Sequence, residues 1–248
     1  MSDAAMLTSK EASNREAIRT LTLDRPAKAN TLSADFVEAL LRFIAAATCD
    51  DTRVLVIKAA GKNFSAGFDL AATNEQSDGD LVRRFVRIEE LLQAIRYAPF
   101  LTIACAQGAA FGAGADLVAA CTFRVGTPGT RLRFPGFQFG VALGTRHLAR
   151  IVGATRARAI LLDNELLDAT QALACGLLTH VVAAEDFDST IARLARGAQR
   201  LHRHALNSLL SNTTEDSRDS DLAALVRSIS APGLRERIEA YKNTTATR

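Results

Sequence analysis

The sequence predicts an α/β protein with a parallel sheet, and two kinds of segment support this class. Residues 18–23, 54–57 and 101–106 are short apolar or alternating runs with the length of strands. Segments with apolar residues at helical spacing lie between them, one behind Ser33 and one from Leu81 to Arg96. Strands that alternate with helices in this way are typical of a parallel core covered by helices.

The first strand and the first helix have recognisable ends. Apolar and polar residues alternate in 18–23, and Pro26 ends this run because proline has no N–H for a strand ladder. Ser33 is a good N-cap for the helix that follows, because its hydroxyl can accept from an unpaired N–H of the first turn. Residues 1 to about 14 are small and polar, which predicts a loose arm.

The middle of the chain contains a polar interruption. Residues 71–80 carry few signals of order and predict a mobile loop. The helix 81–96 follows, and Pro99 stops it. Strands are expected next at 101–106 and at 122–125.

The last third of the chain is mostly helical from Arg146 onward. Helices are expected at 186–210, 218–229 and 232–242. A seam near residue 183 suggests two parts. Residues 1–183 are the core that carries the motifs described below, and residues 184–248 are a helical region for packing and oligomerisation.

Composition excludes several classes of protein. The 248 residues are 48% hydrophobic and 23% charged, as in ordinary globular proteins, and the basic residues behind the net charge of +3 are dispersed. We therefore expect no nucleic-acid partner. Without an apolar signal core or a run long enough to span a bilayer, we expect a cytoplasmic protein with no membrane contact. The spacing of Cys49, Cys105, Cys121 and Cys175 fits reduced thiols and no metal site.

Two glycine-containing turns are the strongest functional signal. They occupy residues 63–70 (NFSAGFDL) and 107–117 (QGAAFGAGADL), each after a strand and before a helix. Such turns expose backbone N–H groups, and a helix N-terminus adds partial positive charge. Two of them brought together can aim two N–H groups at one oxygen, as in an oxyanion hole. Alternatively, the glycines only permit tight turns.

These two turns resemble the signature loops of the crotonase (enoyl-CoA hydratase/isomerase) superfamily. Three further segments resemble other motifs of that family in the same order, at residues 23–33, 133–144 and 172–182. The resemblance covers about residues 18 to 185. It implies a crotonase-like spiral of β-β-α units with a helical C-terminal part.

The resemblance also implies catalytic roles. Phe68 and Ala113 would supply the two backbone N–H groups that hold a thioester oxygen. Hydratases of the family resemble one another in using two glutamates. Asp116 stands at the position of the first, and Gly136, which has no side chain, stands at that of the second. Asp116 is therefore the lone candidate acid or base, although an acid in a first helical turn can also serve only the helix dipole.

Other positions of the middle motif bear on the reaction. The dehalogenase branch of the family has an aspartate nucleophile where this chain has Gly144, so dehalogenation is not expected. Arg133 and Gln138 could reach the acyl pocket from the same motif. Phe137 and Phe139 suggest an apolar acyl site, but both could equally belong to the core.

For the CoA moiety, the resemblance implies binding by Lys28 and Lys62 and by the backbone near Phe64 and Ala66. Each lysine could also be an ordinary solvated surface charge. The pair Tyr241-Lys242 resembles an aromatic-basic pair that some members place over CoA from a neighbouring subunit. No tightly bound cofactor is expected, since coenzyme A arrives as part of the substrate. The family usually forms trimers or hexamers, so a homo-oligomer is implied.

The sequence thus predicts an enzyme of acyl-CoA metabolism that stabilises a thioester enolate. Isomerisation, or another reaction that needs a single carboxylate, is favoured over simple hydration because Gly136 removes one acid. Two alternatives stay open. One is a CoA-thioester-binding protein that has lost catalysis, and the other is a true hydratase with a different acid/base arrangement.

Overall fold

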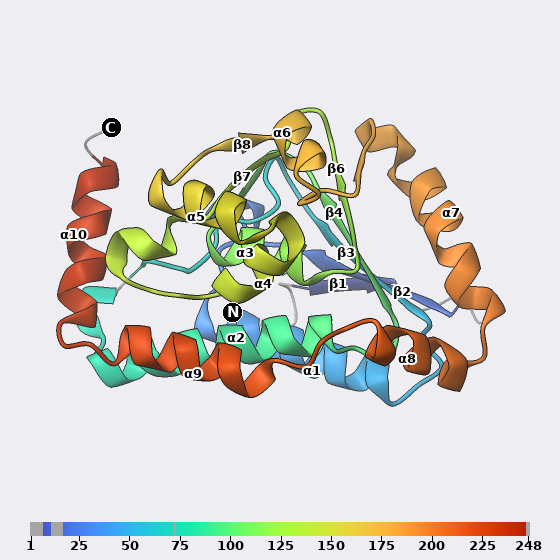
Figure 1. The fold of residues 1–248 in the computed structure, drawn as a ribbon, viewed down its shortest axis with the longest axis horizontal. Helices are drawn as coiled ribbons and strands as arrows, with labels where there is room; N and C mark the ends of the chain where they lie inside the picture. The colour runs from blue at the N-terminus through green and yellow to red at the C-terminus, as the bar shows by residue number, and fades with distance from the viewer. Residues whose placement is uncertain (1–6, 11–16, 72, 247–248) are drawn as a thin grey trace.

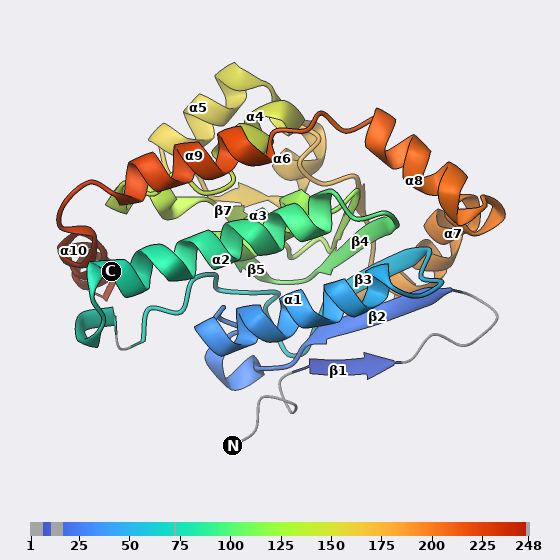
Figure 2. The ribbon, with the colours of Figure 1, turned by 90° about the horizontal axis from the view of Figure 1, so that it is seen from below.

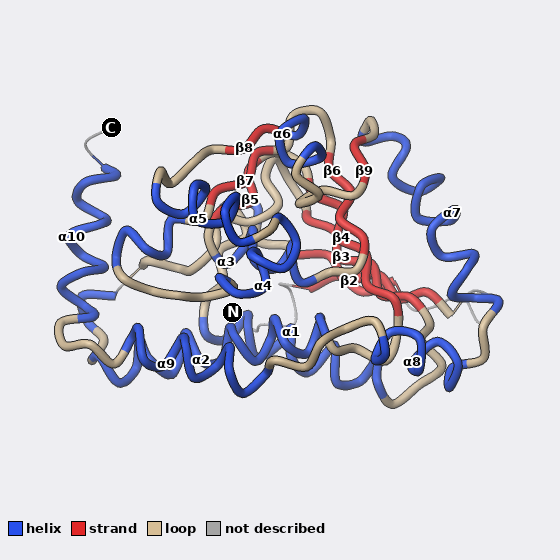
Figure 3. Tube along the Cα trace, in the orientation of Figure 1, coloured by secondary structure: helices blue, strands red, loops and turns tan. Residues whose placement is uncertain are grey.

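The structure, a computed structural model, describes residues 7–10, 17–71 and 73–246. It contains two sheets surrounded by helices (Figures 1 and 3). The larger sheet has the order β1-β2-β3-β4-β6-β9, in which β1 is antiparallel to β2 and the other neighbours are parallel. Its strands are β1 (Leu7–Lys10), β2 (Ile18–Leu23), β3 (Val54–Ala59), β4 (Leu101–Ala106), β6 (Phe123–Gly126) and β9 (His180–Val181). The predicted α/β class with a parallel core is confirmed.

A smaller sheet joins β5 (Ala109–Phe111), β7 (Arg131–Arg133) and β8 (Leu167–Asp168). The chain passes from one sheet to the other and then into a helix. It does so in β4-β5-α3 and again in β6-β7-α4, where α3 is Ala113–Ala120 and α4 is Thr145–Val152. These two successive passages are the β-β-α repeat that the sequence resemblance implied.

Side-chain alternation explains why the parallel strands are apolar throughout. In β3, Val54 and Val56 enter one hydrophobic cluster while Leu55 and Ile57 enter another on the opposite face. The first face is covered by α7 (Phe187–Arg200), which lies along the sheet in Figure 1. A strand covered on both faces needs apolar residues at every position, so the period of two is lost.

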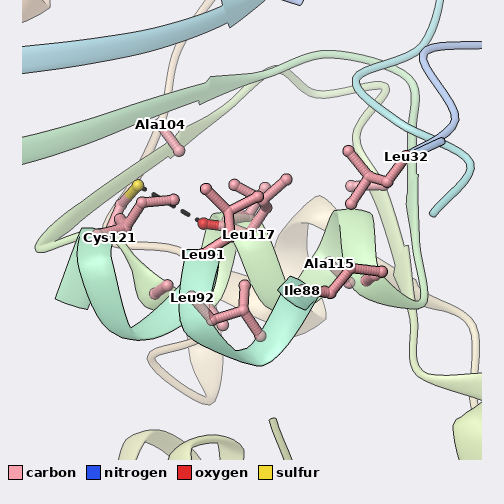
Figure 4. Packing of buried hydrophobic residues seen from close by; sticks show 14 of the residues in the cluster. Leu32, Ile88, Leu91, Leu92, Ala104, Ala115, Leu117 and Cys121 are labelled. Carbon is pink, nitrogen blue, oxygen red and sulfur yellow. Dashed lines mark hydrogen bonds between the residues drawn. The ribbon is translucent and has the colours of Figure 1, made fainter. Parts of the chain in front are cut away.

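The opposite face of the sheet is covered by α1 (Ala34–Thr48), α2 (Asp78–Arg96) and α3. Figure 4 shows α3 beside α2, with Leu117 close to Leu91 and Leu92. All eight residues of α3 are buried. Small residues predominate in this helix, and they allow it to pack closely against its neighbours.

The remaining helices complete the shell. They are α5 (Ala154–Leu162), α6 (Ala169–Ala174), α8 (Arg203–Asn212), α9 (Arg218–Ile229) and α10 (Leu234–Ala246). Helix α9 packs on α2, and Figure 2 shows the two side by side. Helix α10 contacts two short 3₁₀ segments, Thr73–Glu75 and Pro135–Phe139. The helices after residue 183 therefore pack on the same cores as the strands, and the division at that residue stays a prediction.

Several predicted boundaries were wrong. Residues 7–10 form β1 rather than part of a loose arm, because they pair with β2, while residues 1–6 and 11–14 lie outside the described part. The predicted loop 71–80 ends early, since Ser77 and Asp80 form a capping box that starts α2 at Asp78. The expected helix 186–210 is two helices, because the chain is extended at Leu201 and His202.

The short strands β5, β7, β8 and β9 were not predicted from the sequence. Each has two or three residues, too few for a periodicity signal. Among the cysteines, Cys105 and Cys121 are buried, Cys175 is half-buried and Cys49 is exposed; all four are free thiols. Burial raises the pKa of the Cys105 and Cys121 thiols to about 12, which keeps them protonated.

Candidate active site

The two glycine turns lie against each other. The N–H of Ser65 donates to the carbonyl of Ala109 at 3.1 Å, and the N–H of Phe111 donates to the carbonyl of Ser65 at 2.9 Å. These bonds align the first turn with β5, the strand that leads into the second turn. At Gly67, which has φ +87°, an added Cβ would stand 2.4 Å from the Phe111 oxygen and 3.1 Å from the Ala113 nitrogen. Only glycine fits this contact.

This contact brings the N–H groups of Phe68 and Ala113 to one place. Phe68 follows Gly67 directly, and Ala113 is the first residue of α3. Neither N–H donates a hydrogen bond to any part of the chain that the structure describes. Two adjacent N–H groups without acceptors, one of them at a helix N-terminus, have the features of an oxyanion hole.

The side chain of Phe68 is held firmly. Its ring stacks on Phe85 of α2, with ring centroids 4.3 Å apart and planes at 11°. The guanidinium of Arg84 lies 4.0 Å from the centroid of the same ring and donates to the Asp69 carbonyl at 2.7 Å. Phe68 is 8% exposed. Because its side chain is packed in this way, the direction of its backbone N–H is fixed.

A cavity of about 130 Å³ opens at the two N–H groups. Phe68, Ala113 and Asp116 all line it, so the structure brings the three predicted catalytic residues together. The rest of its wall is largely apolar and includes Leu70, Phe85, Phe111, Phe134, Phe137, Phe139, Val141, Leu143 and Leu161. Gln138 is exposed and does not line the cavity.

Asp116 is a buried acid on the first turn of α3. Its residue is 6% exposed, and burial raises the pKa of its carboxyl well above the usual value, with the charge of nearby Glu89 adding to the effect. Glu89 is itself buried on α2, and burial raises its pKa as well. An acid whose pKa is raised keeps its proton at higher pH than usual, which suits a group that must both accept and return a proton.

Gly136 cannot simply be regarded as a glutamate position with its side chain removed. A Cβ at this residue would stand 2.7 Å from the carbonyl oxygen of Val141. Moreover, the N–H of Val141 donates to the carbonyl of Gly136 at 2.9 Å, which fixes the two segments against each other. The local backbone therefore excludes any side chain at the place where hydratases carry their second acid.

The predicted CoA-binding residues differ in their exposure. Lys28 and Lys62 are exposed, and Ala66 is exposed and lines the cavity. The side chain of Phe64 is fully buried in the core. The N–H of Phe64 donates to Gln107 and that of Ala66 donates to Ala29, both at 2.9 Å. The backbone of these two residues can thus offer a ligand only their carbonyl groups.

Among the cavity residues that were not assigned to it from the sequence, two come from helices α10 and α5. Tyr241 of α10 lines the cavity of its own chain and packs on Phe139, with ring centroids 5.0 Å apart. The resemblance had suggested contact with a neighbouring subunit, and no local signal indicates how α10 folds back. Leu161 of α5 also lines the cavity. It is far in sequence from the other lining residues, and periodicity does not reveal such contacts.

Two further features are absent from the described residues. In this part of the chain, no three His, Cys, Asp or Glu side chains are grouped so that they could hold a metal ion. Nor does any described helix have the length and apolar character needed to cross a membrane.

Comparison with known proteins gives a consistent result. The family model described as enoyl-CoA hydratase/isomerase matches residues 13–242. A crystal structure from Bordetella parapertussis that carries the same description superposes with a TM-score of 0.92 at 43% identity, covering 96% of this chain and 98% of that one.

Two curated relatives have different descriptions within the family. The enoyl-CoA hydratase echA6 of Mycobacterium bovis, so described, is 34% identical over 77% of each chain. The trans-2-decenoyl-[acyl-carrier-protein] isomerase of Streptococcus mutans is 35% identical over 73% of each chain. The resemblance drawn from the sequence motifs and the crotonase-like fold are both confirmed, and the chain belongs to the enoyl-CoA hydratase/isomerase family of the crotonase superfamily.

Proposed function

We propose that this protein is an acyl-CoA enzyme that moves a proton on a thioester enolate, with double-bond isomerisation favoured over hydration. The N–H groups of Phe68 and Ala113 bind the thioester oxygen, and Asp116 is the acid/base. The observation that carries the proposal is the cavity in which two unpaired N–H groups and one buried carboxyl meet, while the position of a second acid is closed.

Isomerisation needs only one carboxylate. The base takes a proton from C2 of a 3-enoyl thioester, and negative charge moves onto the thioester oxygen to give a dienolate. The same group then returns the proton to C4, so the double bond moves and nothing is consumed. Two N–H donors stabilise the charge, and losing one such donor typically lowers the rate about 100- to 1000-fold.

Hydration makes different demands. Water must add to C3 while a proton is delivered to C2, which in this family is divided between two acids. The Val141 carbonyl, which blocks a side chain at Gly136, supports a reaction that uses one acid. The comparisons do not separate the two reactions, because a relative described as a hydratase and one described as an isomerase have similar identities to this chain. Two alternative hypotheses compete with isomerisation. One is a hydratase with another acid/base arrangement, and the other is a CoA-thioester-binding protein without catalysis.

The family acts on CoA thioesters, and we assign CoA binding to Lys28, Lys62 and the carbonyl groups of Phe64 and Ala66. Both lysines are exposed and can meet phosphates as point charges. No further cofactor takes part. We also propose a homotrimer or a hexamer in the cytoplasm, to which exposed apolar side chains such as Leu162 and Leu173 contribute contact area.

A mass-resolved assay with 3-enoyl-CoA and 2-enoyl-CoA substrates tests the reaction. A double bond that moves without change of mass, in wild type but not in Asp116→Asn, supports isomerisation. Gain of one water supports the hydratase reading instead. Binding of both thioesters without any product supports a protein that has lost catalysis.

The oxyanion hole has its own test. Ala113→Pro deletes one N–H at the first position of a helix, where proline is tolerated. Ala154→Pro is a matched control, since Ala154 also follows a glycine N-cap, begins α5 and does not line the cavity. We expect a loss of about 100-fold or more for the first variant and little change for the second. Equal activities would remove Ala113 from the site.

A further inference from the structure

A second charged residue lines the acyl cavity. Arg133 ends β7, and its carbonyl accepts the N–H of Gly112 at 2.8 Å, one residue before the donor Ala113. Its guanidinium carbon lies 5.9 Å from the ring centroid of Phe111, another lining residue. The charge of Arg133 also acts on the Tyr241 phenol, lowering a pKa that burial raises. Arg133 therefore faces the cavity beside the oxyanion hole.

This guanidinium has no anionic partner. No carboxylate lies within 4.0 Å of it in the described part of the chain, and its buried Nε has no hydrogen-bond acceptor there. Asp116, which lines the same cavity, forms no ion pair with it. The other arginines near the cavity are occupied: Arg84 donates to Asp69 and Gln76, and Arg237 to Phe139 and Ala231.

An unpaired cation beside an apolar wall is unfavourable unless an anionic group of a ligand pairs with it. The planar guanidinium matches a carboxylate in particular, because two parallel N–H groups can bind its two oxygens. Among the residues that line the cavity, Asp116 and Arg133 are the only two of the Asp, Glu, Lys and Arg types. Among these lining residues, Arg133 is therefore the one cationic side chain that a ligand carboxylate could meet.

We propose that Arg133 selects acyl-CoA substrates whose acyl group carries a free carboxylate in addition to the thioester. The thioester oxygen binds at Phe68 and Ala113, and the distal carboxylate of the acyl chain binds the guanidinium of Arg133. This assignment rests on the proposed function, because it places the thioester in the same oxyanion hole.

The phosphates of CoA are a poorer match for Arg133. The exposed Lys28 and Lys62 lie outside the group of residues that line the cavity, whereas Arg133 lies within it among aromatic side chains. A cavity of about 130 Å³ suits a short acyl group rather than a nucleotide. The carboxylate would remain intact during the reaction, because an ion pair with arginine stabilises it and so opposes its loss as carbon dioxide.

Binding of saturated thioesters tests the proposal without any turnover. Titration calorimetry would compare glutaryl-CoA with hexanoyl-CoA, which have acyl chains of similar length and differ in the terminal carboxylate. We expect wild type to bind glutaryl-CoA about tenfold more tightly or better, as for a hydrogen-bonded charge pair. Arg133→Gln should abolish this preference and leave hexanoyl-CoA binding nearly unchanged, while Arg133→Lys should keep part of it.

Arg131→Gln is the matched control, because Arg131 lies on the same strand, is exposed and carries the same charge. It should keep the preference. The proposal is overturned if wild type does not prefer glutaryl-CoA, or if Arg133→Gln keeps the preference. Equal losses for both thioesters and for free CoA would assign Arg133 to the CoA moiety instead. Failure of the isomerase assay would leave these binding results unaffected, so the two proposals can fail separately.

Discussion

The carboxyl group of Asp116 lies against the backbone of Gly144. A Cβ at Gly144 would stand 2.2 Å from Oδ1 of Asp116 and 2.7 Å from its Cγ. By the motif resemblance, the dehalogenase branch of the family carries an aspartate at this position, whereas glycine leaves room here for the carboxyl of Asp116. With φ at +61°, the position also favours glycine for its backbone.

Gly144→Ala should therefore move the carboxyl of Asp116 away from the substrate. A small displacement of a catalytic group can cost about 100-fold in rate, and we expect a loss of this order with thioester binding retained. Gly176→Ala is the control, because Gly176 has φ +79° and its nearest atom is 3.9 Å from a built Cβ. Both variants carry backbone strain, and only the first crowds Asp116. Similar activities for the two would contradict the role of Asp116.

Gly136→Glu should not produce an efficient hydratase. The new side chain would have to pass the Val141 carbonyl oxygen, which is 2.7 Å from its Cβ, so the loop must shift before the carboxyl reaches the cavity. We expect no gain of water on a 2-enoyl-CoA and a lower melting temperature. Rapid hydration by this variant would show that the loop yields easily and that only the missing carboxyl separates this chain from the hydratases.

Glu89 should set the pH dependence of turnover through Asp116. The base must be ionised to take a proton, so the rate should rise with pH through the raised pKa of Asp116. Glu89→Gln removes a charge that helps to raise the pKa of Asp116. The rising limb of the pH–rate profile should therefore move to lower pH. Glu90→Gln, at a half-buried neighbour paired with Arg87, should leave the limb in place. A limb that does not move in Glu89→Gln would contradict the coupling.

The same raised pKa predicts how stability depends on pH. Above about pH 3.8 the unfolded chain loses the Asp116 proton while the folded chain keeps it, so the unfolded state binds fewer protons and stability falls as pH rises toward the folded pKa. Asp116→Asn removes this loss. The melting temperature of the variant relative to wild type should thus be higher at pH 8 than at pH 4. A constant difference across this range would show that Asp116 is not a buried acid.

The sequence predicted the two glycine turns of the candidate oxyanion hole more completely than the rest of the candidate site. Gly67 and Gly112 are local signals, because a turn with φ above zero favours glycine. The closed position at Gly136 was different. Its missing side chain was visible, but the carbonyl of Val141 that excludes a replacement depends on how the 3₁₀ segment folds.

Long-range packing limited the prediction of the fold in the same way. The buried runs of β3 and β4 identified the parallel sheet, because strands covered on both faces are apolar throughout. Tyr241 reaches the cavity only because α10 folds back onto the core, and nothing in residues 232–242 indicates that direction. Strand β1 was missed because its pairing with β2 gives it order that its composition does not.

Asp221 should be the main electrostatic support of the helices behind the site. Its carboxyl, on a side chain 11% exposed, accepts from Ser217 Oγ at 2.6 Å and lies 2.9 Å from Arg146, 3.5 Å from Arg150 and 3.8 Å from Arg96. These contacts join α9 to α2 and α4. Asp221→Asn leaves the arginines without this anion, and we expect a loss of about 3 kcal/mol in the free energy of unfolding, measured in urea.

Asp216→Asn is the control. It breaks a pair with Arg218 that is more than half exposed, so its unfolding curve should nearly match wild type. Equal curves for both variants would mean that the arginines find other partners and that Asp221 does not hold these helices together.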